Sequence, residues 1–267
     1  MASKTTRRQT GRRSKWAAAA LIGIGLLVSG GVYAGASAAM AATEPSSAVA
    51  STLTVDDGKK LFQANCATCH GLNMEGSPDG PALFGVGELA VEFQMATGRM
   101  PLQMQGPQAP QKPVQFTEDQ IKAIAAWVQS TSPGPSYPDA AVLDGKGDLA
   151  NGAELFRINC AMCHNVAAMG GALTEGKYAP ALTNTSPLHI YAAMVTGPQN
   201  MPVFNDMTLT TDEKRDIISA LLWMQQNESA GGFSLGSLGP VSEGLFIWIF
   251  GIGSLIALTV WITAKSN

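Results

Sequence analysis

Cysteine and histidine are scarce in this sequence, and basic charge is scarce over most of its length. The 267 residues include four Cys and three His, and only 14% of them are charged. Residues 44–240 contain ten Lys and Arg against nineteen Asp and Glu, so this part carries a net charge of about −9. That sign excludes a nucleic-acid partner. It suits either a basic protein surface as partner or plain solubility.

Charge is missing altogether from a segment near the C-terminus. Residues 244–264 are uncharged and rich in Leu, Ile, Phe and Trp. As a helix these 21 residues would extend about 31 Å, which matches the thickness of about 30 Å of a bilayer's hydrocarbon core. We therefore predict a transmembrane helix, with Trp248 and Trp261 at its two interfaces.

A second uncharged segment, residues 16–43, follows a basic cytoplasmic tail, residues 1–15. Basic residues, an apolar stretch and small residues are also the parts of a cleaved secretory signal. The apolar stretch, from Trp16 to about Val32, exceeds the roughly 7 to 15 residues usual in a signal, which favours a retained membrane anchor. A retained anchor makes the chain multi-pass in the cell membrane, with both termini cytoplasmic and the residues between the anchors extracytoplasmic.

All four cysteines fall in two copies of one motif, NCATCHG at 65–71 and NCAMCHN at 159–165. Around them the same residues recur 94 positions later: Gly58, Phe62, Asn65, Cys66, Cys69 and His70 match Gly152, Phe156, Asn159, Cys160, Cys163 and His164. After an insertion, Pro81-Ala82-Leu83 and Thr97-Gly98 recur 99 positions later as Pro180-Ala181-Leu182 and Thr196-Gly197. Such self-similarity indicates two copies of one structural unit.

We predict an all-α fold with two tandem domains, residues 53–131 and 146–228. A Pro-rich linker, residues 132–145, joins them, and a flexible linker, residues 229–243, precedes the membrane helix. In each domain a short helix leads into the Cys motif and an amphipathic helix closes the unit. The stretch between these helices, about 45 residues, has no clear helical or strand period.

The closing helices have acidic first turns after Thr117 and Thr211, which we predict as their N-caps. Where the first and last helices of a domain cross, Gly58 is expected to meet Trp127, and Gly152 to meet Trp223. About 80 residues are few for a self-sufficient core. A large apolar cofactor at the centre of each domain would remove this difficulty and account for the irregular stretch.

The Cys-x-x-Cys-His motif admits four interpretations. A disulfide within each pair would close a tiny loop and leave the histidine unexplained. Zinc needs four ligands per site, and only His189 remains once His70 and His164 are counted. A thioredoxin-like redox pair would lack its strand–helix–strand setting. Covalent haem c uses every residue, because two thiols on one turn bond the two vinyl groups and the next side chain is an imidazole ligand to iron. The predicted attachment residues are Cys66, Cys69, Cys160 and Cys163.

The second axial ligand of each haem iron decides between electron transfer and ligand chemistry. A Met-Pro pair follows Thr-Gly in both copies, as Met100-Pro101 and as Met201-Pro202. A thioether is a soft ligand that favours ferrous iron, and the following proline restricts the loop. We predict the axial pairs His70 with Met100 and His164 with Met201. The rival methionines are Met95, Met104, Met194 and Met207.

His189 is the chief rival ligand at the second haem. The repeat places it opposite Ala90, where the first domain has no ligand at all, so a structural or surface role is favoured. Pro81 and Pro180 are predicted to offer their carbonyls to the free N–H of the ligating imidazoles, since such imidazoles usually donate to a carbonyl.

With these motifs in place, each domain resembles a class I cytochrome c. The whole layout resembles the dihaem cytochrome cc subunit of bcc-type menaquinol:cytochrome c reductase, also called the cytochrome bc1 complex cytochrome c subunit. The resemblance implies an electron-transfer subunit of a quinol–cytochrome-c reductase, a translocase of the respiratory chain. It implies a cytochrome b, a Rieske iron–sulfur protein and an aa3-type oxidase as partners, with electrons entering at the first haem and leaving from the second.

Other functions remain open at this point. One is a free-standing, membrane-anchored dihaem carrier, and another is the dihaem subunit of a different terminal oxidase, such as the cbb3 type. The cbb3 family usually places its membrane helices before the haem domains, which disfavours it here. A dihaem peroxidase would need one haem with an open axial position.

Overall fold

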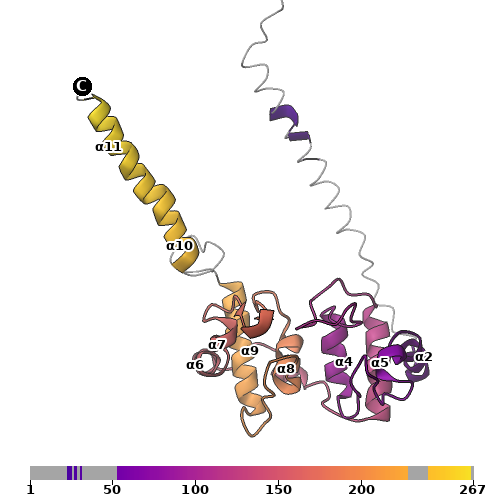
Figure 1. Cartoon of the computed structure of the whole chain (residues 1–267). Coiled ribbons are helices and arrows are strands. Elements are labelled where there is room, and N and C mark those ends of the chain that lie inside the picture. The colour runs from indigo at the N-terminus through magenta and orange to yellow at the C-terminus, as the bar shows by residue number, and fades with distance from the viewer. Residues whose placement is uncertain (1–22, 26, 29–30, 32–52, 228–239, 266–267) are drawn as a thin grey trace, which may run out of the picture. The chain divides into compact units, whose positions relative to one another are not determined.

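Helices dominate the structure, a computed structural model that describes residues 23–25, 27–28, 31, 53–227 and 240–265 (Figure 1). The described residues before position 53 are helical, and the rest of the predicted N-terminal anchor or signal, 16–43, lies outside the described residues. Most of the predicted flexible linker, 229–243, also lies outside them. The all-α prediction is confirmed, while the proposed domain boundaries stay a prediction.

The first haem-domain candidate contains four helices: α2 (Val55–Asn65), α3 (Ala67–His70), α4 (Gly87–Ala96) and α5 (Glu118–Thr131). Its apolar core gathers Phe62, Met74, Ile124 and Val128, which are at most 1% exposed. The core therefore lies where the first and last helices meet.

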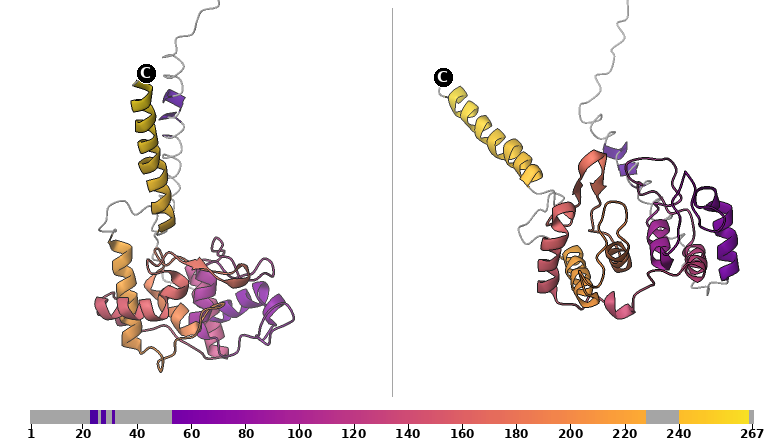
Figure 2. Two further views of the ribbon diagram at one scale, coloured as in Figure 1. Left: turned by 60° about the vertical axis from the view of Figure 1, so that its left-hand side comes forward. Right: turned by 60° about the horizontal axis from the view of Figure 1, so that its bottom comes forward.

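The second unit repeats this order with small additions. Its elements are η1 (Ala140–Val142), α6 (Leu149–Asn159), α7 (Ala161–His164), β1 (Gly171–Ala172), η2 (Thr174–Gly176), β2 (Tyr178–Ala179), α8 (Pro187–Thr196) and α9 (Thr211–Gln226). The two short strands pair antiparallel, with Gly171 opposite Ala179 (Figure 2). They occupy the five-residue insertion and its surroundings, so the extra residues form a small hairpin.

The first and last helices of each domain cross at a glycine. A Cβ added to Gly58 would lie 2.0 Å from the carbonyl oxygen of Ala123, and one added to Gly152 would lie 2.0 Å from that of Asp216. Any side chain would force these helices apart, so the repeat keeps glycine at both crossings. The predicted crossings are therefore confirmed, although the residues opposite the glycines are not the tryptophans.

The two tryptophans differ in their environment. Trp127 is 8% exposed and its ring centroid lies 4.7 Å from that of Phe62. Trp223 is 53% exposed, and the expectation that it packs at the helix crossing was wrong. The N-caps show why: the cap equivalent to Thr117 is Thr210, which places Ala220 rather than Trp223 at the position of Trp127.

The closing helices begin with capping boxes. Thr117 accepts a hydrogen bond from the backbone N–H of Gln120, and the Gln120 side chain accepts one in return. In α9 the cap is Thr210, paired with Glu213, one residue before the predicted Thr211. Reciprocal capping satisfies backbone donors that the first turn leaves free, and it fixes where the preceding loop ends.

The stretch predicted to lack a period contains a helix in each domain, α4 and α8, so that prediction was wrong there. These helices are apolar on several faces because each packs against two neighbours. Helix α4 contacts α5 of its own domain and α8 of the other, while α8 also contacts α9. A helix buried on more than one side has no single apolar stripe for a periodicity search to find.

The two domains meet through α4 and α8. Leu89, Phe93 and Ala192 are buried together there, with Leu188 and Tyr191 packed against them. At the edge of this contact His189 Nε2 lies 4.0 Å from Glu92 Oε1. The domains therefore share a small apolar interface of their own.

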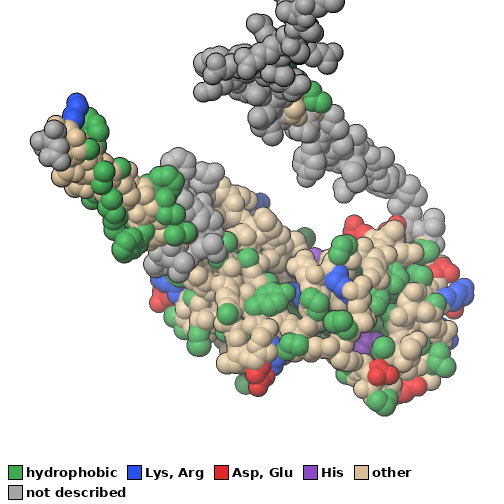
Figure 3. All heavy atoms as spheres, turned by 45° about the horizontal axis from the view of Figure 1, so that its top comes forward, with side chains coloured by type: hydrophobic (Ala, Val, Ile, Leu, Met, Phe, Trp, Pro, Cys, Tyr) green, Lys and Arg blue, Asp and Glu red, His purple; other side chains and the backbone are tan. Residues whose placement is uncertain are grey.

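The C-terminal helix runs through α10 (Pro240–Phe246), the π-helical segment η4 (Ile247–Ile252) and α11 (Gly253–Lys265). The helix Ser242–Lys265 is 24 residues long, and its most apolar 18-residue stretch has a mean hydropathy of 2.3, so it is long and apolar enough to cross a membrane. None of that stretch is buried against the rest of the chain. Hydrophobic side chains line its visible side (Figure 3).

Candidate functional site

The two Cys motifs adopt the same local geometry. Helix α2 ends one residue before Cys66, and the next short helix carries Cys69 and His70. The backbone N–H of His70 donates to the Cys66 carbonyl at 2.9 Å, and the N–H of His164 donates to that of Cys160 at the same distance. Both thiols and the imidazole of each motif are thus carried on one turn of chain.

Each motif histidine has a backbone carbonyl at its Nδ1. His70 Nδ1 lies 2.8 Å from the carbonyl oxygen of Pro81, and His164 Nδ1 lies 2.9 Å from that of Pro180. A carbonyl only accepts, so Nδ1 carries the proton and Nε2 is left with a free lone pair. Burial lowers the pKa of His164, which favours this neutral, ligating form.

The first cysteine is buried in the second motif, as Cys160, and partly buried in the first, as Cys66. Burial, with the neighbouring thiol as a smaller cause, raises the pKa of Cys66 and of Cys160 to about 11. Such thiols stay protonated at neutral pH and are therefore poor nucleophiles. Among the described residues all four cysteines are free, and no cluster of three or more Cys, His, Asp or Glu could hold a metal ion. The disulfide and zinc interpretations find no support in this geometry.

A cavity in the second domain brings its predicted site residues together. Cys160, Cys163, His164 and Met201 line it, along with apolar side chains such as Phe156, Ile190 and Leu221. Met194 also lines the cavity, whereas Met207, the other rival, is 98% exposed. An apolar cavity with two thiols, a free imidazole nitrogen and a thioether has the donor set that haem c requires.

The first domain repeats this arrangement around its own core. Cys66 and Met100 both pack, partly buried, against the cluster that contains Phe62. The rivals are Met95, which is 5% exposed within the same cluster, and Met104, which is 74% exposed in the loop beyond. The structure therefore leaves Met104 and Met207 in solvent and keeps Met100 and Met201 against the cores.

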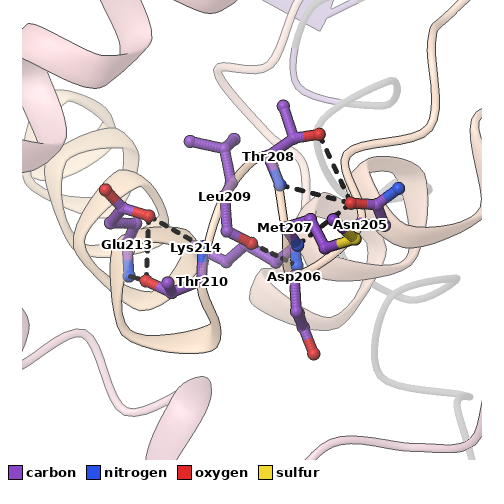
Figure 4. Close-up of polar contacts among 8 residues, drawn as sticks. All are labelled: Asn205, Asp206, Met207, Thr208, Leu209, Thr210, Glu213 and Lys214. Carbon is purple, nitrogen blue, oxygen red and sulfur yellow. Dashed lines mark hydrogen bonds and ion pairs between the residues drawn. The ribbon is translucent and has the colours of Figure 1, made fainter.

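A buried lysine stabilises the loop that follows Met201 (Figure 4). The Lys214 side chain, which is fully buried, donates to Asp206 Oδ1 at 2.6 Å and to the Leu209 carbonyl at 2.7 Å. Asn205 Oδ1 accepts from the backbone N–H groups of Met207 and Thr208, closing a turn. These contacts join the loop to α9 and so limit the movement of Met201.

The first domain holds its Met-Pro loop differently. Lys112 contacts it twice, because its backbone N–H donates to the Gly98 carbonyl at 3.2 Å and its Nζ donates to the Pro101 carbonyl. The position equivalent to Lys214 is Ile121, a core residue that is 2% exposed. The same loop is therefore restrained by a different lysine in each domain.

The second cavity is not built from the second domain alone. Six residues of the first domain line it: Phe93, Ala96, Thr97, Arg99, Gln108 and Gln111. Arg99 is 7% exposed, its guanidinium carbon lies 5.1 Å from the centre of the Phe93 ring, and burial lowers its pKa. Sequence reasoning missed these residues. One sign of them was present in the repeat, because Arg99 stands directly after Thr97-Gly98 where the second copy has Pro198.

His189 also lines this cavity. Burial, and secondarily Arg99, lowers the pKa of His189, while burial raises that of Glu92 across the interface. The Phe93 ring meets the imidazole edge-on, with 6.0 Å between ring centroids. The structure thus gives His189 partners from the first domain, in line with a structural role.

Comparison with known proteins supports this assignment of two haem domains. A family model described as cytochrome c matches residues 55–132, and one described as cytochrome c oxidase, cbb3-type, subunit III, matches residues 147–219. Each half is thus similar to proteins that bind haem c covalently. The two predicted haem c groups are confirmed at this level.

Relatives of similar length are also known. The chain is 48% identical to the cytochrome bc1 complex cytochrome c subunit of Corynebacterium efficiens over 79% of this chain and 77% of that protein. It is 42% identical to the subunit of the same name from Mycobacterium bovis over 99% of this chain and 96% of that one. A cbb3-type oxidase subunit of Sinorhizobium medicae is 28% identical over 43% of this chain and 40% of its own length.

Proposed function

This chain belongs to the family of cytochrome bc1 complex cytochrome c subunits, and on that premise we propose that it carries electrons from a Rieske iron–sulfur protein to an aa3-type cytochrome c oxidase. It is a dihaem electron-transfer subunit of a bc1 complex, with two covalently bound haem c. Its place in that complex makes the whole assembly, and not this chain alone, the quinol–cytochrome-c reductase.

The observation that carries the proposal is the second cavity, where Cys160, Cys163, His164 and Met201 line one apolar space. We assign these residues as thioether anchors and axial ligands of the second haem. By the repeat, Cys66, Cys69, His70 and Met100 have the same roles at the first. The haem supplies an iron that alternates between ferrous and ferric states, and the protein's part is to hold its ligands still.

Ligand rigidity supports electron transfer in place of bond chemistry. The prolyl carbonyls orient both histidines, while Lys112 and Lys214 restrain the loops that carry the methionines. A site that moves little between oxidation states loses little energy on each transfer. A thioether and an imidazole on the same iron also leave no coordination position for peroxide or oxygen, which disfavours a peroxidase.

The order of transfer is part of the proposal. We infer that the first haem receives from the Rieske centre and that the second delivers to the oxidase, with a cytochrome b as a further neighbour. The contact of α4 with α8 supports direct transfer between the two haems, since it holds the haem domains together without a diffusing carrier. The direction is taken from the family resemblance. The C-terminal helix tethers the chain, and we place the haem domains on the extracytoplasmic side with two membrane anchors.

Methionine-to-histidine variants test the order in the native complex. Exchanging a thioether for a second imidazole removes the ligand that raises the potential, so the altered haem becomes a poor acceptor. Met201→His should stop oxygen consumption by quinol while the first haem stays reduced in the steady state. Met100→His should leave both haems oxidised. Stopped-flow absorption spectra with an oxygen electrode measure both.

Met104→His and Met207→His are matched controls, because these methionines lie in the same loops and are exposed. Both should retain wild-type oxygen consumption. If Met201→His leaves oxygen consumption intact, or leaves the first haem oxidised, the proposed order is wrong. Recovery of the chain alone in mild detergent, free of cytochrome b and oxidase, would contradict the proposed partners.

A further inference from the structure

A loop of the first domain is tied to both sides of the second cavity. Gln108 forms two hydrogen bonds with Tyr178: its Oε1 accepts from the backbone N–H at 2.8 Å and its Nε2 donates to the carbonyl at 2.9 Å. The backbone N–H of Ala109 donates to Gln199 Oε1 at 3.2 Å. Tyr178 lies two residues before Pro180, and Gln199 two residues before Met201, so these bonds reach both chain segments that position the second iron ligands.

Arg99, from the same part of the first domain, lines the second cavity with its side chain 93% removed from solvent. Among the described residues no carboxylate pairs with its guanidinium, and no hydrogen bond of that group is found. The nearby buried acid, Glu92, lies instead by His189 Nε2 and accepts from the Tyr137 hydroxyl. Arg99 is therefore a buried cation without an anion.

An uncompensated buried charge is costly, and proteins pair such charges almost without exception. The Phe93 ring, 5.1 Å from the guanidinium carbon, offers a cation–π contact that orients Arg99 but leaves its charge in place. Five N–H donors in a planar fork also match the oxygens of a carboxylate or a phosphate. The missing anion therefore belongs to whatever fills the cavity.

Haem brings carboxylates into a protein through its two propionate groups. We propose that Arg99 of the first domain binds a propionate carboxylate of the haem held by the second domain. This inference rests on the assignment of that haem to Cys160, Cys163 and His164. It makes the second haem site a joint product of both domains.

The repeat explains why this contact runs in one direction. The second domain has Pro198 at the position equivalent to Arg99, so it has no matching cation to offer. In the first domain, the backbone N–H groups of Arg99 and Met100 both donate to the Gln94 carbonyl, at 3.0 and 2.9 Å. A single short turn thus presents a ligand to one haem and a cation to the other.

Arg99→Gln tests the inference in the purified complex by redox titration of both haems. The oxidised haem carries one more positive charge than the reduced haem, so a nearby cation disfavours the oxidised state. Loss of that cation should therefore lower the potential of the second haem. Arg99→Lys, which keeps the charge, should restore most of that potential. Met201→His should lower the potential of the second haem, so the titration step that it shifts belongs to the second haem.

Arg157→Gln is the matched control, because Arg157 lies in α6 of the second domain with an exposed side chain. It removes the same charge outside the cavity and should leave both potentials unchanged. A second potential in Arg99→Gln equal to that of wild type, or a fall that Arg157→Gln reproduces, overturns the inference. Mass spectrometry showing no haem on the second motif of the wild-type chain would instead refute the proposed haem site.

A second measurement covers the case in which Arg99→Gln does not fold. Resonance Raman spectra report the bending mode of a haem propionate, which responds to its hydrogen bonds. In Arg99→Lys the planar fork is replaced by a point donor, so this mode should shift for one haem while both methionine-to-iron charge-transfer bands persist. An unchanged propionate mode overturns the proposed contact.

Discussion

The two haem domains share a helical frame and differ in how self-sufficient they are. In both, glycine permits the first and last helices to cross, and a prolyl carbonyl meets the motif histidine. The cavity of the second domain, however, is completed by six side chains of the first. The two repeated domains thus have the same haem-binding residues, but the second also depends on side chains of the first to complete its cavity.

Comparing the two copies shows which positions they share for haem binding and which supporting positions differ. Cys, His and Met-Pro positions match in both copies, because haem attachment and ligation fix them. The lysines that restrain the methionine loops, Lys112 and Lys214, come from non-equivalent positions. Rigid ligand loops can therefore be built in more than one way.

Removing one haem at a time should have the largest effect, and it tests the difference between the two domains most directly. Cys66→Ser with Cys69→Ser should remove the first haem and also shift the potential of the second, because the first domain lines the second cavity. Cys160→Ser with Cys163→Ser should remove the second haem and change the first potential less. Mass spectrometry counts the haems, and redox titration measures the remaining one. Equal shifts in both double variants would contradict the asymmetry.

The two tryptophans offer a second contrast. Trp127→Ala removes a buried ring that packs on Phe62, and should lower the free energy of unfolding by about 3–5 kcal/mol. Trp223→Ala changes a side chain that is 53% exposed, and should stay within about 0.5 kcal/mol of wild type. Denaturant unfolding of the full chain in detergent, followed by the methionine-to-iron band, measures both. Similar losses would show that Trp223 is buried in the folded protein.

Lys214→Met should have a smaller effect, and one confined to the second domain. Loss of the hydrogen bond to the Leu209 carbonyl should cost about 1–3 kcal/mol in the free energy of unfolding. The matched position in the first domain already holds an apolar side chain, so Ile121→Met is the control. Unfolding of each domain is followed by its own methionine-to-iron band.

The same variant carries a pH signature. The hydrogen bond from Lys214 lowers the pKa of Asp206, so the stability that it gives is complete above the unfolded pKa of Asp and is lost as the pH falls through the lower, folded pKa. The difference in stability between wild type and Lys214→Met should therefore shrink on acidification through that range. A difference that stays constant with pH would show that the ion pair adds nothing.

Sequence alone predicted the parts of the fold that follow from spacing and pattern. The Cys-x-x-Cys-His motifs, the crossing glycines and the C-terminal apolar helix needed no knowledge of tertiary contacts. The helices α4 and α8 were missed because burial between two domains leaves them without a one-sided apolar pattern. Trp223 was misplaced because the closing helix begins at Thr210, three residues out of step with the tryptophans.

The contribution of the first domain to the second cavity lay beyond sequence reasoning for a different reason. Gln108 and Ala109 form hydrogen bonds across the interface, and their partners, Tyr178 and Gln199, lie 70 and 90 residues further along the chain. No local pattern encodes a contact of that kind. The departure from the repeat at Arg99 was visible, but its meaning depended on knowing what the side chain faces.

The hydrogen bonds of Gln108 to Tyr178 also bear on how the protein is made. A ribosome completes the first domain before it reaches the second Cys-x-x-Cys-His, and domains usually fold in that order. The surface that closes the second cavity therefore exists before the cavity does. We therefore expect haem attachment to follow the same order, with the folded first domain already present when the second domain takes up its haem.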